Sequence, residues 1–488
     1  KTKKSPKKQE KKVMQNKVVQ ISLWETYTKV SEAEASNVPE FLRLLDEYLD
    51  WDEIIPEQFR HAYYSYTGRP HTYSLESMLA ILTLQRIIGV EIDKAFLKVL
   101  ACSAELRKFC GIHSVPDAAQ ITRFKQTYRE FLKQVFQKLV DLTAPLCAEM
   151  DAAKAQTLIF DTTGIEARVF ENNPKFFNGK LSQAKSFAKK NPGYNPYSGV
   201  YALLPDHAEH NPEIRQQYIN GHFCYALKAG ILTDGLGIVR HIEFFDDEFK
   251  KSCPETVEKK SDDPDSDKET GDSTALIPVL DSFRLLHPQL KFNTFLGDSA
   301  FDSYDNYDLL LNALGFDRAV IPINRRNSKP NVSSGFNEVG CPVCPRDGTP
   351  FIFAGECRGK HRSRRLKYVC PKSAKKGTSR VCTCENPCTD SPYGRCVYVY
   401  PHKNLRLHPG IERGSAEWND LYKCRTAVER DIEILKDVLG VSGRMTFNSD
   451  TLKADLFIAA IVQLIGVLIS GKIAKPELCL SIRKIFAV

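Results

Sequence analysis

The sequence predicts an α/β protein in which a mixed sheet is flanked by helices, with an all-α region before the sheet and a cysteine-rich insertion within the sheet domain. Apolar residues recur at helical spacing throughout residues 38–150. Further along the chain, short apolar strands alternate with helical segments, which is typical of a mixed sheet covered by helices. Eight of the 15 cysteines then fall within residues 341–396.

The charge of the 488-residue chain is unevenly distributed. The formal net charge is +8, from 68 Lys and Arg against 60 Asp and Glu. Residues 1–12 contribute +6 and residues 324–415 contribute +12, so the rest of the chain is net acidic. Two basic segments attached to an acidic remainder indicate a protein that binds a polyanion such as nucleic acid.

Neither the N-terminal segment nor the apolar segments predict a membrane protein. Residues 1–37 are predicted to form a basic, largely disordered arm. The segment Leu456–Ser470 is shorter than the roughly 18 apolar residues of a membrane-spanning helix, so we expect a buried core helix. Clustered cysteines favour metal binding in a reducing compartment over disulfides, and we expect a cytoplasmic protein without a membrane partner.

The helical region, residues 38–150, is predicted to be a DNA-binding domain. Leu75–Val90 is apolar on most faces and should lie in its core. A second helix should begin at Asp117, because a carboxylate is favourable near the positive end of a helix. That helix carries Arg123 and Lys125, which are predicted DNA contacts. The alternative is a helical bundle with a solvated charged face.

The sheet domain is predicted from residues 151–323 and 416–475. Thr157–Asp161 and Phe292–Gly297 are apolar strands, and the pair Asp234-Gly between two apolar runs predicts a hairpin. Each of the first two strands is followed or ended by a carboxylate, which is a common position for a side chain that lines a cleft. The alternative is that these carboxylates only satisfy turns.

Two polar segments interrupt this domain. Residues 171–220 are rich in Asn, Pro, Tyr and Lys and predict an irregular insertion, which could be a DNA-facing loop or a dimer contact. Residues 250–272 hold five Lys against eight Asp and Glu and predict a mobile acidic loop.

An amphipathic helix is predicted over Trp418–Leu439, with a polar stripe on one side. At about 100° per residue, four side chains of this helix fall on one face. They are Tyr422, Arg425, Glu429 and Lys436. The alternative is a solvated stripe of ion pairs, because Arg425 and Glu429 stand four residues apart.

These residues together resemble the DDE transposases of bacterial insertion sequences, whose catalytic domain is RNase H-like. The spacing Tyr422-x2-Arg425-x3-Glu429-x6-Lys436 matches their Y-x2-R-x3-E-x6-K signature. The segments around Asp161 and Asp298 look like their first-Asp and second-Asp strands, although many relatives have Tyr or Gly-Tyr near Ala300-Phe301. The resemblance covers roughly residues 40–470.

The resemblance implies three catalytic carboxylates, Asp161, Asp298 and Glu429, which hold two Mg²⁺ or Mn²⁺ ions. Hard oxygen ligands suit Mg²⁺, and a pair of ions can stabilise both the attacking and the leaving oxygen. We infer that Asp161 bridges the ions and that the other two carboxylates each complete one site. The resemblance also implies contacts with the backbone of transposon-end DNA by Tyr422, Arg425 and Lys436. For Asp302 we favour a helix N-cap.

The cysteine-rich basic insertion, residues 324–415, is predicted to contain β-strands and to bind zinc. Eight thiolates would complete two four-cysteine sites, although their pairing stays open and His361 could replace one of them. The eight predicted ligands are Cys341, Cys344, Cys357, Cys370, Cys382, Cys384, Cys388 and Cys396. The basic run 358–367 predicts nucleic-acid contacts by Arg362, Arg364 and Arg365, with a merely solvated run as the alternative.

The sequence thus predicts a DNA transposase that binds the terminal inverted repeats of its element, cleaves the ends by two-metal hydrolysis and joins the 3′-OH ends to target DNA. Because both ends are cut and joined together, we expect a homodimer, at least on double-stranded DNA. We expect it in a prokaryotic cytoplasm, associated with the nucleoid when bound to DNA. The alternatives are an RNase H-like DNA nuclease without strand transfer, a catalytically inactive, transposase-derived zinc protein that binds DNA, and an RNA-binding protein whose acids form salt bridges.

Overall fold

The computed structural model describes most of the chain. The described residues are 38–64, 69–219, 222–257, 270–324, 335–337, 340–359, 362–377 and 379–485. The predicted N-terminal arm and residues 258–269 of the predicted acidic loop lie outside these ranges.

The described segment before the sheet is helical, as its periodicity predicts. Its helices are α2 (Glu40–Tyr48), α3 (Trp51–Ile54), α4 (Glu57–Tyr63), α5 (Leu75–Ile88), α6 (Asp93–Cys102), α7 (Ala104–Phe109), α8 (Ala118–Thr127), α9 (Arg129–Met150) and α10 (Ala152–Ala155). Asp117 caps α8 as predicted, since its carboxylate accepts a hydrogen bond from the Gln120 amide at 2.7 Å.

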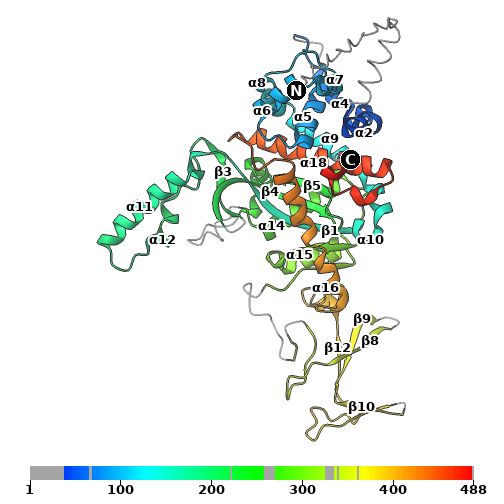
Figure 1. Cartoon of the computed structure of the whole chain (residues 1–488). Helices are drawn as coiled ribbons and strands as arrows, with labels where there is room; N and C mark the ends of the chain where they lie inside the picture. Colours follow the sequence, from blue (N-terminus) through cyan, green and yellow to red (C-terminus); the bar gives the residue numbers. More distant parts are fainter. Residues whose placement is uncertain are drawn as a thin grey trace, which may run out of the picture.

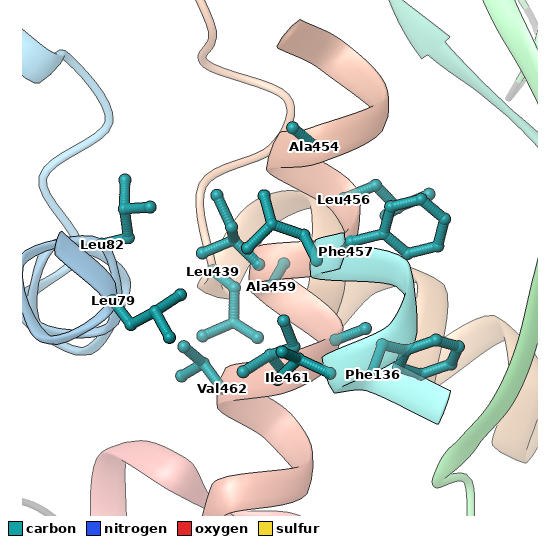
Figure 2. Close-up of a cluster of buried hydrophobic side chains, with 14 of the residues drawn as sticks. Leu79, Leu82, Phe136, Leu439, Ala454, Leu456, Phe457, Ala459, Ile461 and Val462 are labelled. Carbon is teal, nitrogen blue, oxygen red and sulfur yellow. The ribbon is translucent and has the colours of Figure 1, made fainter. Parts of the chain in front are cut away.

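A long apolar helix, α18 (Ser449–Lys472), joins this helical layer to the sheet. It packs against α5 and α9 on one side and against β5 on the other (Figure 1). Figure 2 shows Phe457 beside Phe136 of α9, and Val462 facing Leu79 of α5. By length and composition the helix could cross a membrane, but its apolar 18-residue window is entirely buried inside the protein, as expected for the core helix predicted here.

Three cationic side chains meet the buried carboxylate of Asp455 in α18. Asp455 accepts from Arg86 and Arg444, and its carboxylate lies 2.9 Å from Lys125 Nζ. Lys125 is fully buried and also lies 3.2 Å from Asp93. The prediction that Lys125 contacts DNA is therefore corrected: its ammonium group neutralises buried carboxylates, whereas Arg123, two residues before it, is exposed.

The main sheet is mixed, as predicted, with the strand order β2-β3-β4-β1-β6-β7 and with β5 paired to β4. Its strands are β1 (Thr157–Glu166), β2 (His207–Ala208), β3 (Asn211–Ile219), β4 (His222–Asp234), β5 (Val239–Phe244), β6 (Thr294–Leu296) and β7 (Arg318–Val320). β1 runs antiparallel to β4 and parallel to β6. The predicted hairpin joins β4 to β5, where the Asp234 carboxylate accepts from the Leu236 and Ile238 amides.

Helices cover both faces of the sheet around β1. Because successive strand residues point to opposite faces, Phe160 packs toward α14 (Asp272–Leu286), whereas Ile159 packs against Val428 of α17 (Thr426–Glu433). The shorter elements around these layers are α13 (Asp247–Ser252), η3 (Pro254–Thr256), η4 (Ser299–Phe301), α15 (Tyr304–Asp308), η5 (Leu309–Ala313), α16 (Ala416–Lys423), η7 (Ile434–Val438), η8 (Pro476–Leu478) and α19 (Ile482–Ile485).

Residues 171–220 are not the irregular insertion that their composition predicts. After η1 (Phe170–Asn172), they form the 17-residue helix α11 (Pro174–Lys190), followed by α12 (Pro196–Gly199) and η2 (Tyr201–Leu203). The chain then returns into the main sheet through β2 and β3. Asn173 and Pro174 start α11 as an N-cap and a first-turn proline, so the residues that suggested a loop are helix-start signals.

The described residues between β7 and α16 form two small sheets, which extend away from the main sheet in Figure 1. One has the order β12-β9-β8 and the other pairs β10 with β11. The strands are β8 (Ile352–Gly359), β9 (Arg362–Val369), β10 (Ser373–Lys376), β11 (Ser379–Cys382) and β12 (Cys396–Val399), and η6 (Pro401–Lys403) follows them.

Asp302 anchors the segment that follows these sheets and does not cap a helix. Its buried carboxylate accepts hydrogen bonds from Arg406, from the Tyr307 hydroxyl at 3.0 Å and from the Asn324 amide at 2.7 Å. Ser303 is the residue that caps α15. The cap prediction for Asp302 is wrong, because the side chain faces a distant arginine that the sequence places 104 residues away.

Candidate active site

Strand β1 places Asp161 at the centre of the sheet, between β4 and β6. The strand is buried up to Phe160, and the burial decreases at Asp161 and Thr162. The Thr162 amide donates to the Asp161 carboxylate at 2.8 Å. The side chain of Asp161 thus lies at the boundary between an apolar strand and solvent, with 22 % of its surface exposed.

Asp298 lies beside Asp161 because their strands are parallel neighbours. Leu296 of β6 pairs with Ile159 of β1, and each aspartate follows its paired residue by two positions. The Asp298 carboxylate also accepts from the Ala300 amide at 2.7 Å and caps η4. Both carboxylates line a cavity of about 250 Å³ on the same side of the sheet.

Glu429 of α17 lies near Asp161, although it comes much later in the chain. It lines a second cavity, of about 560 Å³, together with Asp161. Arg425 connects the two acids: it forms an ion pair with Glu429 and lies 3.6 Å from Asp161. The structure therefore brings together the three carboxylates that the sequence predicts as catalytic residues, from three different elements.

The electrostatic environment of Asp161 disfavours its ionised form. Burial raises the pKa of Asp161 to about 7, and the neighbouring carboxylates of Asp298 and Asp272 contribute to the increase. The Thr162 amide and Arg425 act in the opposite direction and are outweighed. Such a group gains most from a bound cation, because a cation removes the repulsion between the carboxylates.

Asp272 is an acid of this site that the sequence reasoning missed. It stands in the first turn of α14, where it accepts from the Thr162 hydroxyl at 2.9 Å and pairs with Lys228 at 2.8 Å. It lines the smaller cavity with Asp161 and Asp298. The sequence assigned it to the predicted acidic loop, where seven other acids made it indistinguishable from its neighbours.

The predicted helix over Trp418–Leu439 is not continuous. α16 ends at Lys423, α17 begins at Thr426, and a π-helical turn follows in η7. At Cys424 and Arg425 the backbone stays right-handed helical, but its amides donate to carbonyls three residues back, as in a 3₁₀ turn. A π turn near a functional residue is a common device for redirecting a side chain.

The other two residues of the predicted stripe, Lys436 and Tyr422, contact neighbouring parts of the protein. Lys436 donates to the Gly164 carbonyl of β1 at 2.9 Å and lines the larger cavity beside Glu429. Tyr422 packs partly buried against the apolar cluster under α17, with Arg425 6.0 Å from its ring. Gly164 lines both cavities, and a Cβ there would require the side chains of Ile219 and Gln217 to shift.

A second group of potential metal ligands lies at the far end of β1. The ligand atoms of Glu166, His222 and Cys224 all lie within 4.8 Å of one another. His222 Nε2 is 3.5 Å from the Glu166 carboxylate, and burial raises the pKa of the Cys224 thiol to about 12. All three side chains line the larger cavity.

The predicted zinc ligands divide into two groups in the structure. All 15 cysteines are free of disulfides. Desolvation and the neighbouring Cys344 and Cys370 thiols raise the pKa of Cys388, and desolvation with Cys382 and Cys370 raises that of Cys384. These pairwise interactions connect the five thiols of Cys344, Cys370, Cys382, Cys384 and Cys388, whereas Cys341 donates a hydrogen bond to the Phe351 carbonyl, Cys357 lies in β8 and Cys396 is exposed in β12.

The predicted nucleic-acid contacts of the insertion lie on β9. Arg364 is half exposed and pairs with Glu356 on β8. Arg365 stacks on the Tyr398 ring at 4.3 Å, which leaves less of its guanidinium available to a phosphate. The side chain of Arg362 lies outside the described residues.

Comparisons with known proteins give matches to transposases. Residues 30–127 match a family model described as a transposase domain (DUF772), and residues 263–465 match one described as a transposase DDE domain. The second match includes Asp298 and Glu429, whereas Asp161 precedes it. A search of curated proteins gave no match.

Among solved structures, the chain is similar to a piggyBac transposase, determined by cryo-EM as a synaptic complex with hairpin DNA. The TM-score is 0.36 at 10 % sequence identity, covering 92 % of this chain and 78 % of that chain. The first match covers the helical layer up to α8, and the second covers the chain from before α14 into α18, whereas strands β1 to β5 lie between the two matches. Residues 263–465 are thus similar to a transposase DDE domain, and residues 30–127 are similar to a second transposase domain.

Proposed function

We propose that this protein is a bacterial insertion-sequence transposase that cleaves the ends of its own DNA element and joins the 3′-OH ends to target DNA. The observation that carries the proposal is the meeting of Asp161, Asp298 and Glu429 around two adjoining cavities, from β1, the end of β6 and α17. The β1–β6 pair with a carboxylate on each strand and a third on a covering helix is also what an RNase H-like catalytic domain requires.

The three carboxylates fit a pair of Mg²⁺ or Mn²⁺ ions. All three offer hard oxygen ligands, and the pKa of Asp161 is raised by burial and, to a smaller extent, by the neighbouring carboxylates of Asp298 and Asp272. Asp161 lines both cavities and so would be shared between the two ions, with Asp298 and Glu429 on either side. Bound ions would supply a deprotonated nucleophile and neutralise the charge that develops on the phosphate.

The surrounding cations would hold the DNA strand. Arg425 lies between Asp161 and Glu429, so a metal that takes over these carboxylates would free its guanidinium for a phosphate. Lys436 fixes its ammonium group on the β1 backbone at the edge of the larger cavity. Both side chains would orient the scissile phosphate against the carboxylates. The helical layer, which carries Arg123, would recognise the terminal inverted repeats.

A strand-transfer assay tests the proposal. The purified protein is incubated with Mg²⁺ or Mn²⁺, a duplex that carries the end of its own element, and a target plasmid. We expect nicked ends and joined products from the wild type, and neither from Asp298→Ala. Cleavage without joined products would favour a DNA nuclease, and DNA binding without cleavage in the wild type would favour an inactive, transposase-derived protein. A homodimer on paired ends is expected in the same reactions.

We also propose that the cysteine-rich insertion binds zinc through the five clustered thiols. Four thiolates complete a tetrahedral zinc site, and Cys344, Cys370 and Cys388 with either Cys382 or Cys384 supply them. We expect about one zinc per chain by elemental analysis, lost in Cys370→Ser and kept in the control Cys102→Ser, whose thiol is exposed in α6. Two zinc ions per chain would instead support two four-cysteine sites, and none would contradict zinc binding.

A further inference from the structure

The helical projection formed by α11 and α12, residues 172–205, carries charge of one sign only. It holds five lysines and contains no Asp, Glu or Arg. Four of them, Lys175, Lys185, Lys189 and Lys190, are exposed, and Lys180 is half-buried. Within the described part of the chain, no ion pair includes any of these five lysines.

A helix that is merely solvated usually mixes both signs of charge. Alternation of acids and bases at spacings of three or four residues stabilises an exposed helix, whereas like charges at that spacing destabilise it. Lys185 and Lys189 stand four residues apart with no acid between them. The last turn of α11 favours Lys189 and Lys190, but Lys175 stands in the first turn, where a cation is unfavourable, and α11 contains no acid to balance any of its lysines. This one-signed charge is expected where a polyanion supplies the missing negative charge.

Aromatic contacts hold the lysines of α11 in place. The rings of Phe187 and Tyr194 meet edge to face at 4.9 Å, which ties the end of α11 to the turn before α12. Lys185 Nζ lies 5.1 Å from the ring of Tyr197 in α12. At about 1.5 Å per residue, the 17 residues of α11 present their lysines along about 25 Å. Duplex DNA carries about 15 phosphates over that length.

The base of the projection is part of the candidate active site. The chain enters it from β1, which carries Asp161, and leaves it into β3, where Gln216 and Tyr218 line the smaller cavity. Figure 1 shows α11 and α12 extending sideways from β3, away from the helical layer and from the cysteine-rich insertion. A duplex held by its phosphate at Asp161 would thus meet the projection on the flank of the cut.

We propose that the α11–α12 projection binds the phosphates of the duplex beside the cleavage site and makes no base-specific contacts. The inference rests on the proposed transposase function and adds a DNA contact to the same site. Lysine ammonium groups are point charges that bind phosphate oxygens in any sequence, and each contact releases condensed counterions. The projection therefore contributes to the affinity for DNA and to its salt dependence, whereas other parts of the protein recognise the DNA sequence.

A salt titration of binding tests the projection. The full chain with Lys185→Gln, Lys189→Gln and Lys190→Gln is compared with the wild type and with a control that carries Lys291→Gln, Lys475→Gln and Lys484→Gln. The three control lysines are also exposed and lie outside the projection. The dissociation constant is measured between 50 and 200 mM salt, on an element-end duplex and on a scrambled duplex of the same length.

The projection variant should bind both duplexes about tenfold or more weakly, to a similar extent. The slope of log K against log salt should fall by about 2.7, which is about 0.9 for each lost phosphate contact. The control should keep the wild-type slope, and circular dichroism should show the same helix content in all three proteins.

Each remaining outcome overturns either the projection or the function, and the two are distinguishable. An unchanged slope in the projection variant, in a preparation whose wild type still cleaves, contradicts the DNA contact alone. An unchanged slope with a loss of the dimer in sedimentation shows that the projection contacts a second copy of the chain instead. A wild type that binds DNA with the expected slope difference but never cleaves contradicts the proposed function and leaves the projection as a DNA contact.

Discussion

Asp161→Asn is expected to abolish cleavage while making the metal-free protein more stable. The substitution removes the carboxylate that lines both cavities, so DNA cleavage should fall by about 10³-fold or more. The same change removes a charge that burial and two neighbouring carboxylates oppose, so the amide should raise the melting temperature of the metal-free protein near pH 8. A catalytic residue that opposes stability is the expected signature of a cation site.

The pH dependence of stability gives the sign of this effect. The pKa of Asp161 is raised from 3.8 to about 7 by folding, so the folded chain holds a proton that the unfolded chain has lost between these values. The free energy of unfolding of the metal-free wild type should therefore decrease, relative to Asp161→Asn, as the pH rises from about 4 to about 7. Added Mg²⁺ should stabilise the wild type above pH 7 and leave the variant unchanged.

Thermal unfolding of three proteins, with and without Mg²⁺, checks the prediction. The control is Asp305→Asn, which makes the same chemical change at an exposed carboxylate of α15 that lies outside both cavities. It should keep the cleavage activity and the metal response of the wild type. If Asp161→Asn cleaved DNA at the wild-type rate, or gained stability from Mg²⁺ as the wild type does, Asp161 would not be a metal ligand.

Asp455→Asn is expected to destabilise the protein by about 3–5 kcal/mol, the largest structural effect among these predictions. Asp455 is fully buried and is the shared partner of Arg86, Lys125 and Arg444. These cations hold its pKa well below the usual range, although burial acts in the opposite direction. Removal of the charge leaves three buried cations with Asp93 as their remaining carboxylate, and this imbalance is the source of the loss.

Urea unfolding measures this effect, and the same helix provides the control. Asp450→Asn breaks a pair with Arg129 at the exposed start of α18, and surface pairs of this kind contribute at most about 1 kcal/mol. For the Lys125→Gln variant, the slope of log K for DNA binding against log salt should equal that of the wild type, because Lys125 does not face solvent. A stable Asp455→Asn protein, or a reduced slope in Lys125→Gln, would contradict this account of the network.

The periodicity of the sequence predicted the elements of the fold well where burial is one-sided or complete. The helical layer, the buried helix α18 and the Asp-Gly hairpin at Asp234 all follow from local patterns of apolar residues and turn residues. The strand predicted to end at Asp161 does start at Thr157 but continues to Glu166, so Asp161 lies within β1 and not at its end. That Asp161, Asp298 and Glu429 act together was implied by the resemblance to DDE transposases and not by these local patterns. These signals are local, because hydrophobic spacing and turn chemistry act over a few residues.

Three of the errors arose where a residue's partner lies far away in the chain. Lys125 looks like part of a basic helix face until Asp455 is found beside it. Asp302 looks like a cap until Arg406 reaches it. Asp272 had no distinguishing feature until α14 placed it against Thr162. In each case the local sequence is compatible with two environments, and only long-range packing selects one of them.

The sequence by itself determined the mixed α/β class, the helical layer before the sheet and the three candidate carboxylates, which belong to separate elements. Only the tertiary structure decided which charges are buried, that the helix with Arg425 and Glu429 is broken, and that residues 172–205 project as a basic helix. The physical reason is that burial of a charge depends on what surrounds it: a lysine is stable inside a protein only where carboxylates meet it. That meeting joins helices that are more than 300 residues apart in the chain.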